Sequence, residues 1–141
     1  MEERHVNVLF FLTPKSEVTY IYADDKLSKV IDVMEERGFT AVPMIDRQGH
    51  YLGSVTEGDI LRVIREKKEL NLECIGEITA ANMPRKTEIK AVSGTADMND
   101  MIKRALEQNY VPVVDDDNIF SGIITRRDII QVCYAKAKKY L

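Results

Sequence analysis

Apolar residues recur along the chain at spacings that predict alternating helices and strands. Residues 25–37 and 95–108 each carry the i, i+3, i+4, i+7 spacing of an amphipathic helix. The positions that set this spacing are Leu27, Val30, Ile31 and Met34 in the first stretch, and Met98, Met101, Ile102 and Ala105 in the second. Short runs rich in β-branched residues flank both stretches and predict strands. The pattern predicts an α/β fold of the mixed α+β type.

The second half of the chain repeats the first. Residues 42–64 read VPMIDRQGHYLGSVTEGDILRVI, and residues 111–133 read VPVVDDDNIFSGIITRRDIIQVC. At a constant offset of 69 residues, a Val-Pro pair, an Asp, a Gly, a Thr and an Asp-Ile pair coincide without a gap. Such a register predicts two copies of one structural unit.

Each copy predicts a β-α-β-β-α unit. The unit begins with a short strand (18–22 or 89–92), and its closing helix begins near Glu57 or Arg126. The two strands before the closing helix are joined by the turns Asp46-Arg47-Gln48-Gly49 and Asp115-Asp116-Asp117-Asn118. One unit of this size leaves a sheet face uncovered, so we expect two pseudo-symmetric repeats packed through their sheets. We place the first repeat at residues 1–68 (with an N-terminal segment, 1–11), a linker at 69–83 and the second repeat at 84–141.

Composition and charge narrow the class of protein. The 141 residues are 45% hydrophobic and 30% charged, which favours a folded globule over a disordered chain. A net charge of −3 gives no general attraction to nucleic acid or to an anionic membrane, so an anion site has to be local. The longest apolar run, Val8 to Leu12, is far shorter than the ~20 residues of a membrane span. With only Cys74 and Cys133 as cysteines, we expect free thiols and a cytoplasmic protein.

The residues common to both copies resemble a known family. A β-α-β-β-α unit with Val-Pro, then Asp, then Gly and a Thr-x-x-Asp sequence closely resembles the CBS domain, named after cystathionine β-synthase. Two such units resemble a CBS pair, or Bateman module, from about Leu12 to the C-terminal helix. The resemblance implies a regulatory sensor that binds adenine nucleotides in clefts between the repeats, commonly as a homodimer. It leaves no room for a catalytic domain, so we expect no enzymatic activity.

A narrower resemblance concerns the ligand. Residues 120–127 (FSGIITRR) and 38–43 (GFTAVP) look like stand-alone CBS proteins of Gram-positive bacteria that bind cyclic di-AMP. In those proteins the paired arginines face phosphate, and the Gly-aromatic-Thr-Ala segment lines the base pocket. This sequence departs from them at Glu17, where a basic residue would help to hold an anion, and it keeps Asp59, which suits a more general ribose site. Cyclic di-AMP is therefore our first choice of ligand, AMP, ADP or ATP is the alternative, and no metal or other cofactor is expected.

A Thr and an Asp stand together in each copy where a strand gives way to a helix. The pairs are Thr56 with Asp59 and Thr125 with Asp128. A Thr followed three residues later by an acid is also a helix-capping arrangement, so a purely structural explanation exists. The resemblance implies instead that the Asp accepts hydrogen bonds from a ribose diol and that the Thr hydroxyl donates to phosphate. A carboxylate has enough lone pairs for both roles, and we favour the ligand interpretation.

Arg126 and Arg127 fall in the predicted first turn of the last helix. The positive end of the helix macrodipole disfavours cations there by about 0.3–1 kcal/mol each. Their presence is explained if a phosphate binds among the helix N–H groups and the two guanidinium groups. The alternative is that both side chains point into solvent or pair with the Asp115–Asp117 cluster. Glu57 and Gly58 at the matching positions cannot hold phosphate, so we predict two unequal sites.

The remaining candidates concern the base. Phe39 offers a ring for stacking and Thr40 and Ala41 a backbone edge, with Tyr110 as the nearest analogue, although both aromatics also suit a buried core. Backbone groups of residues 18–19 and 89–90 are expected to form the opposite wall. The predicted nucleotide contacts are Val18, Thr19, Phe39, Thr40, Ala41, Pro43, Thr56, Asp59, Ile89, Lys90, Tyr110, Pro112, Thr125, Arg126, Arg127 and Asp128.

Two other classes of function stay open at this point. A scaffolding or dimerisation module without ligand is one, and the retained Thr and Asp in both copies count against it. A small enzyme is the other, and no base and nucleophile share a motif. The sequence therefore predicts an adenine-nucleotide sensor read by an unidentified partner protein, with no membrane or nucleic-acid partner.

Overall fold

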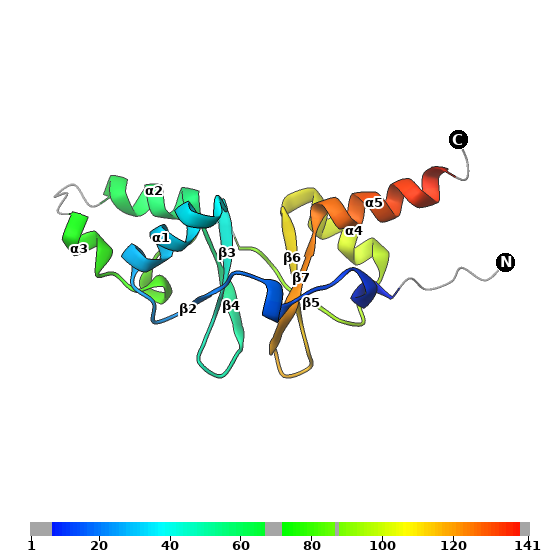
Figure 1. Ribbon diagram of the computed structural model, residues 1–141, viewed down its shortest axis with the longest axis horizontal. Helices are drawn as coiled ribbons and strands as arrows, with labels where there is room; N and C mark the ends of the chain where they lie inside the picture. The colour runs from blue at the N-terminus through cyan, green and yellow to red at the C-terminus, as the bar shows by residue number, and fades with distance from the viewer. Residues whose placement is uncertain (1–6, 67–71, 87, 139–141) are drawn as a thin grey trace. The chain divides into compact units, whose positions relative to one another are not determined.

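The computed structural model describes residues 7–66, 72–86 and 88–138, which form five α-helices and two sheets (Figure 1). The chain divides into two compact units. One, the first-repeat unit, comprises residues 19–88, and the other, the second-repeat unit, comprises residues 1–18 together with 89–141. The predicted mixed α/β class is confirmed. The expected packing of the repeats through their sheets stays a prediction.

The first-repeat unit follows the predicted β-α-β-β-α order. Its elements are β2 (Ile21–Tyr22), α1 (Leu27–Arg37), β3 (Ala41–Ile45), β4 (Tyr51–Thr56) and α2 (Glu57–Glu66). β3 is central, parallel to β2 and antiparallel to β4, and both helices lie on the same side of this sheet (Figure 1). α1 ends where Gly38 adopts the left-handed conformation (φ 69°), which glycine adopts without strain.

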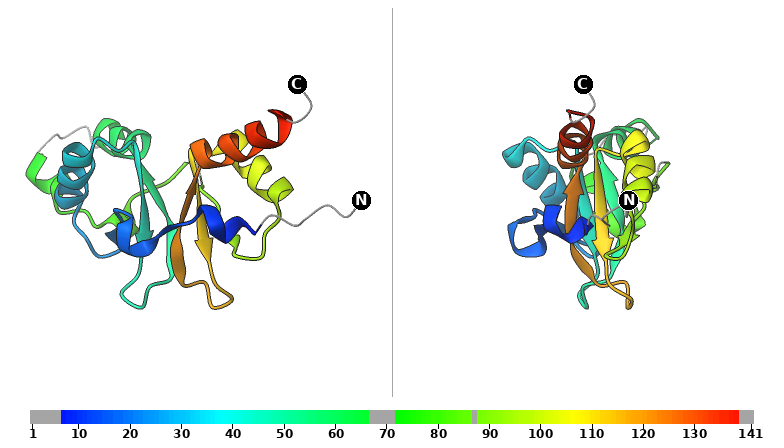
Figure 2. Two further views of the ribbon diagram at one scale, coloured as in Figure 1. Left: turned by 45° about the vertical axis from the view of Figure 1, so that its right-hand side comes forward. Right: turned by 90° about the vertical axis from the view of Figure 1, so that its right-hand side faces the viewer.

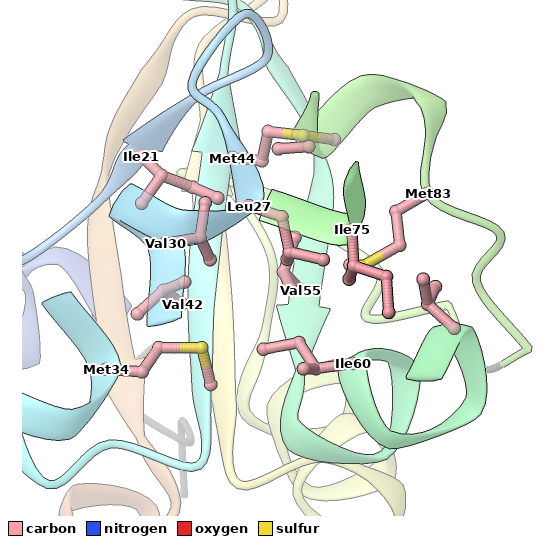
Figure 3. Packing of buried hydrophobic residues seen from close by; sticks show 12 residues of the cluster. Ile21, Leu27, Val30, Met34, Val42, Met44, Val55, Ile60, Ile75 and Met83 are labelled. Atoms are coloured by element: carbon pink, nitrogen blue, oxygen red, sulfur yellow. The ribbon is translucent and has the colours of Figure 1, made fainter. Parts of the chain in front are cut away.

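The core of the first-repeat unit reaches beyond the elements of the repeat (Figure 3). After α2 the chain forms α3 (Leu72–Gly76) and a short 3-10 helix, η3 (Ala80–Asn82). Ile75, Ala80 and Met83 join the buried cluster built by α1, α2 and the sheet. Residues 72–83 of the expected linker are therefore a packed part of this unit, because they supply apolar side chains to its core. Residues 69–71 lie outside the described residues.

The second-repeat unit has the same order of elements. It contains β5 (Val92–Ser93), α4 (Met98–Glu107), β6 (Tyr110–Val114), β7 (Phe120–Thr125) and α5 (Arg126–Ala137), and α5 continues directly from β7 (Figure 2). Preceding them in the chain are η1 (Val8–Phe11), β1 (Thr13–Pro14) and η2 (Lys15–Glu17). The strand order is β1-β7-β6-β5. The fully buried core residues are Val8, Met101, Val111, Val113, Ile124 and Ile129.

The N-terminal strand does not belong to the repeat in which the sequence analysis placed it. β1 pairs antiparallel with β7 of the second repeat, with Pro14 opposite Gly122. Gly122 has φ 153°, and a Cβ at this position would collide with the carbonyl oxygen of Thr13, so glycine permits the close approach. At the matching Gly53 the guanidinium of Arg85 takes this place and donates to the carbonyl of Leu52 at 3.2 Å. Each repeat thus receives the segment that precedes the other repeat in sequence.

The parallel strands are shorter than the predicted 18–22 and 89–92, for a reason shared by both repeats. Extending the observed registers by two residues places Thr19 opposite Val42 and Lys90 opposite Val111. The residues that follow in β3 and β6 are prolines, which have no N–H to donate, so the ladder stops. Residues 19 and 90 are left outside the regular sheet.

Other details of the two units match as the internal repeat predicts. The β3–β4 and β6–β7 ladders both shift register at the equivalent point, between Met44 and Ile45 and between Val113 and Val114. Asp46 and Asp115 each accept backbone hydrogen bonds within their hairpin turns, which confirms the predicted turn positions. Among residues 7–66, 72–86 and 88–138, no helix has the length and apolar character needed to span a bilayer.

Candidate functional site

Each repeat brings together the loop before its central strand and the start of its closing helix. In the first repeat Ala41 lies opposite Thr56, and the N–H of Glu57 donates to the carbonyl of Thr40 at 2.9 Å. We call this region the first half-site; its candidates are Thr19, Phe39, Thr40, Ala41, Pro43, Thr56 and Asp59.

The second repeat forms the corresponding arrangement. Tyr110 lies opposite Thr125, and the N–H of Arg126 donates to the carbonyl of Asn109 at 2.9 Å. We call this region the second half-site; its candidates are Ile89, Lys90, Tyr110, Pro112, Thr125, Arg126, Arg127 and Asp128. Val18 belongs to the second-repeat unit and its neighbour Thr19 to the first-repeat unit, because the boundary between the two units falls between them.

Asp59 in the first half-site is fully engaged by its own chain. Its Oδ2 accepts from the N–H of Thr56 at 3.0 Å, and its N–H donates to the hydroxyl of Thr56 at 3.1 Å. Its Oδ1 accepts from Arg62 at 3.3 Å, and the residue is 1% exposed. This is the reciprocal geometry of a capping box at the start of α2, with an ion pair added. The capping alternative therefore accounts for both oxygens of Asp59.

Asp128 in the second half-site is in a different state. Thr125 caps α5 by accepting from the N–H of Asp128 at 3.1 Å. Within the part of the chain that the structure describes, the carboxylate of Asp128 has no hydrogen-bond or ion-pair partner, and the residue is half-buried. Its oxygens therefore keep their capacity to accept from a ligand.

The two arginines of α5 also differ from each other. The Nε of Arg126 donates to the carbonyl of Ala105 at 2.7 Å, in the last turn of α4. The last carbonyls of a helix lack internal partners and carry the negative end of the dipole, so this bond gives Arg126 a structural role that the sequence analysis missed.

Arg127 is exposed and makes no ion pair or hydrogen bond with any described residue. Among the described residues neither arginine pairs with the Asp115–Asp117 cluster, and the exposed Arg127 fits the other alternative, in which the side chain points into solvent. Instead, Asp115 accepts from its own turn, from the N–H groups of Asp117 and Ile119 at 2.9 Å each. The positive end of α5 therefore presents an uncompensated guanidinium.

The start of α2 has the opposite charge. Its first turn contains the acids Glu57 and Asp59, which complement the helix dipole. The first half-site is thus acidic at the position where the second half-site carries two guanidinium groups. The two half-sites therefore differ in local charge: the start of α2 carries an acid where the start of α5 carries a base.

The two candidate aromatics have different surroundings. Phe39 follows Gly38 in the loop after α1 and is 44% exposed, whereas Tyr110 lies in β6 and is 7% exposed. The core explanation therefore applies to Tyr110 and does not apply to Phe39. An exposed ring beside the Thr40 and Ala41 backbone is available for stacking.

Gln108 is a buried polar residue of the second half-site that the sequence analysis missed. Its Oε1 accepts from the N–H of Lys90 at 2.9 Å, and its Nε2 donates to the carbonyls of Lys90 and Tyr110, each at 3.1 Å. The backbone of Lys90, expected to be an exposed edge for a base, is therefore already paired. The only sequence signal is a glutamine two residues before β6, at the position that Phe39 holds before β3.

No group of three or more His, Cys, Asp or Glu side chains within the described ranges is arranged to hold a metal ion.

A comparison with family models matches the chain twice. The model described as the CBS domain covers residues 11–66 and 75–135. These ranges contain both half-sites and both copies of the internal repeat.

Two curated relatives differ greatly in length. The glycine betaine/carnitine/choline transport ATP-binding protein OpuCA of Bacillus subtilis is 28% identical over 116 residues, which are 81% of this chain and 28% of that protein. Cyclic di-AMP receptor B of Bacillus subtilis is 23% identical over 125 residues, 86% of this chain and 82% of that protein. The chain thus spans little more than a quarter of the first relative and most of the second.

Solved structures share the fold over nearly the whole chain. CbpB in complex with c-di-AMP superposes with a TM-score of 0.81 at 21% identity, covering 96% of this chain and 89% of that one. CBSX2, a protein of Arabidopsis thaliana, in complex with AMP gives a TM-score of 0.72 at 23% identity, covering 92% and 96%. Together with the two matched copies of the family model, the fold and the repeated half-sites show that this chain belongs to the CBS domain family.

Proposed function

We propose that this protein is a regulatory sensor of adenine nucleotides, with cyclic di-AMP as the first candidate ligand. The observation that carries the proposal is the pair of adjacent residues at the start of α5. Arg127 is an unpaired cation at the positive end of a helix, and Asp128 is a half-buried carboxylate without a partner among the described residues. A nucleotide supplies the two groups that satisfy them, a phosphate for Arg127 and ribose hydroxyls for Asp128.

Arg126 supports this anion site in a second way. Its Nε is held by the carbonyl of Ala105, which fixes the plane of the guanidinium. The two terminal nitrogens remain as donors for a phosphate oxygen. A fixed guanidinium loses less conformational entropy on binding than a mobile one.

The first repeat carries its own candidates for base recognition. Phe39 offers an exposed ring on which a purine stacks. Thr19 lies beside the proline-interrupted edge of β3, and its backbone groups make no hydrogen bond with the described residues. An adenine edge carries both donor and acceptor groups, which a backbone N–H and C=O match.

The related proteins favour cyclic di-AMP over the alternatives. One solved relative holds c-di-AMP, another holds AMP, and a short curated relative is described as a cyclic di-AMP receptor. AMP, ADP or ATP is therefore the second candidate. A homodimer and a partner protein that reads the bound state complete the proposal. Binding regulates that partner only to the extent that the nucleotide prefers one conformation of the protein over another.

Thermal unfolding against a nucleotide panel tests this proposal. The panel contains cyclic di-AMP, AMP, ADP, ATP, cyclic di-GMP and GMP. A ligand with micromolar affinity at millimolar concentration adds about 4 kcal/mol to the free energy of unfolding, so the shift in Tm is large. We expect stabilisation by at least one adenine nucleotide and its loss in Arg127→Ala. Failure of every adenine nucleotide to stabilise the wild type would favour the scaffolding alternative, and conversion of the added nucleotide would favour the enzyme.

A further inference from the structure

The side-chain amide of Gln108 is inserted between two strands of the second half-site. It accepts from the N–H of Lys90 and donates to the carbonyls of Lys90 and Tyr110, at 2.9 to 3.1 Å. Gln108 itself is 5% exposed, so its side chain is largely withdrawn from solvent. It fills the gap between Lys90, two residues before β5, and Tyr110 at the start of β6.

We infer that Gln108 occupies, from inside the protein, the position at which the second repeat would read an adenine, so that each chain takes one base, at the first repeat. This inference rests on the proposed function and specifies where its base is bound. A primary amide presents an acceptor beside a donor in one plane. The exocyclic amine of adenine beside a ring nitrogen presents the same pair. The side-chain amide accepts from the Lys90 N–H and donates to the Lys90 carbonyl, as an adenine edge bound there would do.

The gap that Gln108 fills has a cause in the chain itself. If the β5–β6 register is extended by two residues, Lys90 falls opposite Val111, and the next residue, Pro112, has no N–H for the Lys90 carbonyl. A carbonyl left without a donor at this partly buried position is costly, so a donor from elsewhere in the chain, from a ligand or from water has to reach it. Gln108 is that donor in the second repeat.

The first repeat has the same gap without the same filling. The extended β2–β3 register puts Thr19 opposite Val42, and the next residue, Pro43, likewise lacks an N–H. The residue two positions before β3 is Phe39, whose side chain has no amide to insert and is 44% exposed. Thr19 makes no hydrogen bond with the described residues. The unfilled edge is therefore the one in the first repeat.

Isothermal titration with AMP counts the bases bound per chain. We expect one AMP per wild-type chain and a second, weaker AMP in Gln108→Ala, where the Lys90 edge is released. Asn109→Ala is the matched control: the side chain of this exposed neighbour takes no part in the network, and one AMP per chain is expected. Two AMP molecules per wild-type chain, or only one in a folded Gln108→Ala chain, would overturn the inference.

A second measurement uses the wild type alone and covers the case in which Gln108→Ala does not fold. The side-chain amide signals of Gln108 in a ¹⁵N-labelled sample are expected to exchange slowly with solvent and to keep their positions when cyclic di-AMP is added to saturation. Fast exchange, or displacement of these signals by the nucleotide, would overturn the inference and leave the proposed function standing. Binding of neither nucleotide to wild type or variant would overturn the proposed function itself.

Discussion

Arg62 donates to Oδ1 of Asp59 across 3.3 Å, and Asp128 makes no such pair within residues 88–138. The residue that stands 69 positions after Arg62 is Gln131, which carries no charge. Asp59 is thereby an ion-paired part of the α2 cap, whereas the carboxylate of Asp128 has no partner among the described residues. The two aspartates occupy equivalent positions, but Asp59 stabilises the start of α2, whereas the oxygens of Asp128 can still accept hydrogen bonds from a ligand.

Replacing these two aspartates is expected to separate stability from binding. Asp59→Ala removes the capping-box bond and the ion pair and costs about 2 kcal/mol of unfolding free energy. Asp128→Ala leaves the Thr125 cap intact, because that cap uses the Asp128 N–H, and costs about 0.5 kcal/mol or less. It should weaken nucleotide binding about tenfold or more, through loss of a charge-assisted bond to ribose. Urea unfolding and titration calorimetry measure the two effects, and equal losses of stability would contradict the distinction.

Arg127→Ala is expected to weaken cyclic di-AMP or AMP binding by about tenfold or more, because it removes a charge-assisted contact to phosphate. The side chain has no partner among the described residues, so unfolding free energy should change by about 0.5 kcal/mol or less. Arg127→Lys keeps the charge and should restore only part of the affinity, since a planar fork is lost.

The control for the charge at the start of α5 is Glu57→Ala, at the start of α2, where Glu57 matches Arg126 in the repeat. Removing this acid takes away a charge that repels phosphate, so affinity should stay unchanged or rise. Titration of Arg127→Ala and Glu57→Ala with the same nucleotide compares their affinities directly. Equal losses of affinity would show that the two half-sites are not electrostatically different.

The exchanged N-terminal strand predicts different costs for two equivalent glycines. Both have positive φ, 140° at Gly53 and 153° at Gly122, so alanine is strained at either place by about 1–3 kcal/mol. At Gly122 the new Cβ also meets the backbone carbonyl of Thr13, which cannot move without breaking the β1–β7 pairing. At Gly53 it meets the end of the flexible Arg85 side chain. Gly122→Ala should therefore lower the unfolding free energy more than Gly53→Ala, and the reverse order in urea unfolding would contradict the strand pairing.

Tyr51 predicts a loss of stability at alkaline pH. Burial raises the pKa of Tyr51 to about 12, although its hydrogen bond with Ser54 (2.9 Å) acts in the opposite direction. The folded protein then holds this proton more tightly than the unfolded chain, whose Tyr pKa is about 10. The stabilising effect is complete below pH ~10 and is lost as pH rises toward ~12, a change of about 2–3 kcal/mol. Unfolding free energies of wild type and Tyr51→Phe, measured from pH 9 to 11.5, should diverge in this window, and parallel curves would contradict the prediction.

Helix and hairpin positions were predictable because their signals are local. The apolar spacing around Val30 and Met101 and the turn residues after β3 and β6 specify elements without reference to distant parts of the chain. The lengths of β2 and β5 were not predictable in this way. Each strand ends early because a proline in the neighbouring strand, Pro43 or Pro112, has no N–H to donate to it. The exchange of β1 was also hidden, since pairing between Pro14 and Gly122 joins residues far apart in sequence.

The candidate site was predictable in its residue types and less so in their roles. Thr125, Arg127 and Asp128 are placed at a helix start by the repeat, as expected from their spacing. Arg126 and Asp59 have intramolecular partners, Ala105 and Arg62, that only the packing of the folded chain brings near. The role of Gln108 could not be predicted from its position alone, because a single polar residue between a helix and a strand ordinarily lies in solvent.

Titration calorimetry with cyclic di-AMP and cyclic di-GMP tests the central claim most directly. The two ligands have the same ring, the same ribose and phosphate groups and the same charge, so a difference in affinity reports recognition of the base. A site whose backbone groups pair with the adenine edge rejects a base with the wrong donors and acceptors. We predict binding of cyclic di-AMP at least about tenfold tighter than cyclic di-GMP. Equal affinity for both, or binding of neither cyclic di-AMP nor AMP, would contradict the assignment of this protein as an adenine-nucleotide sensor.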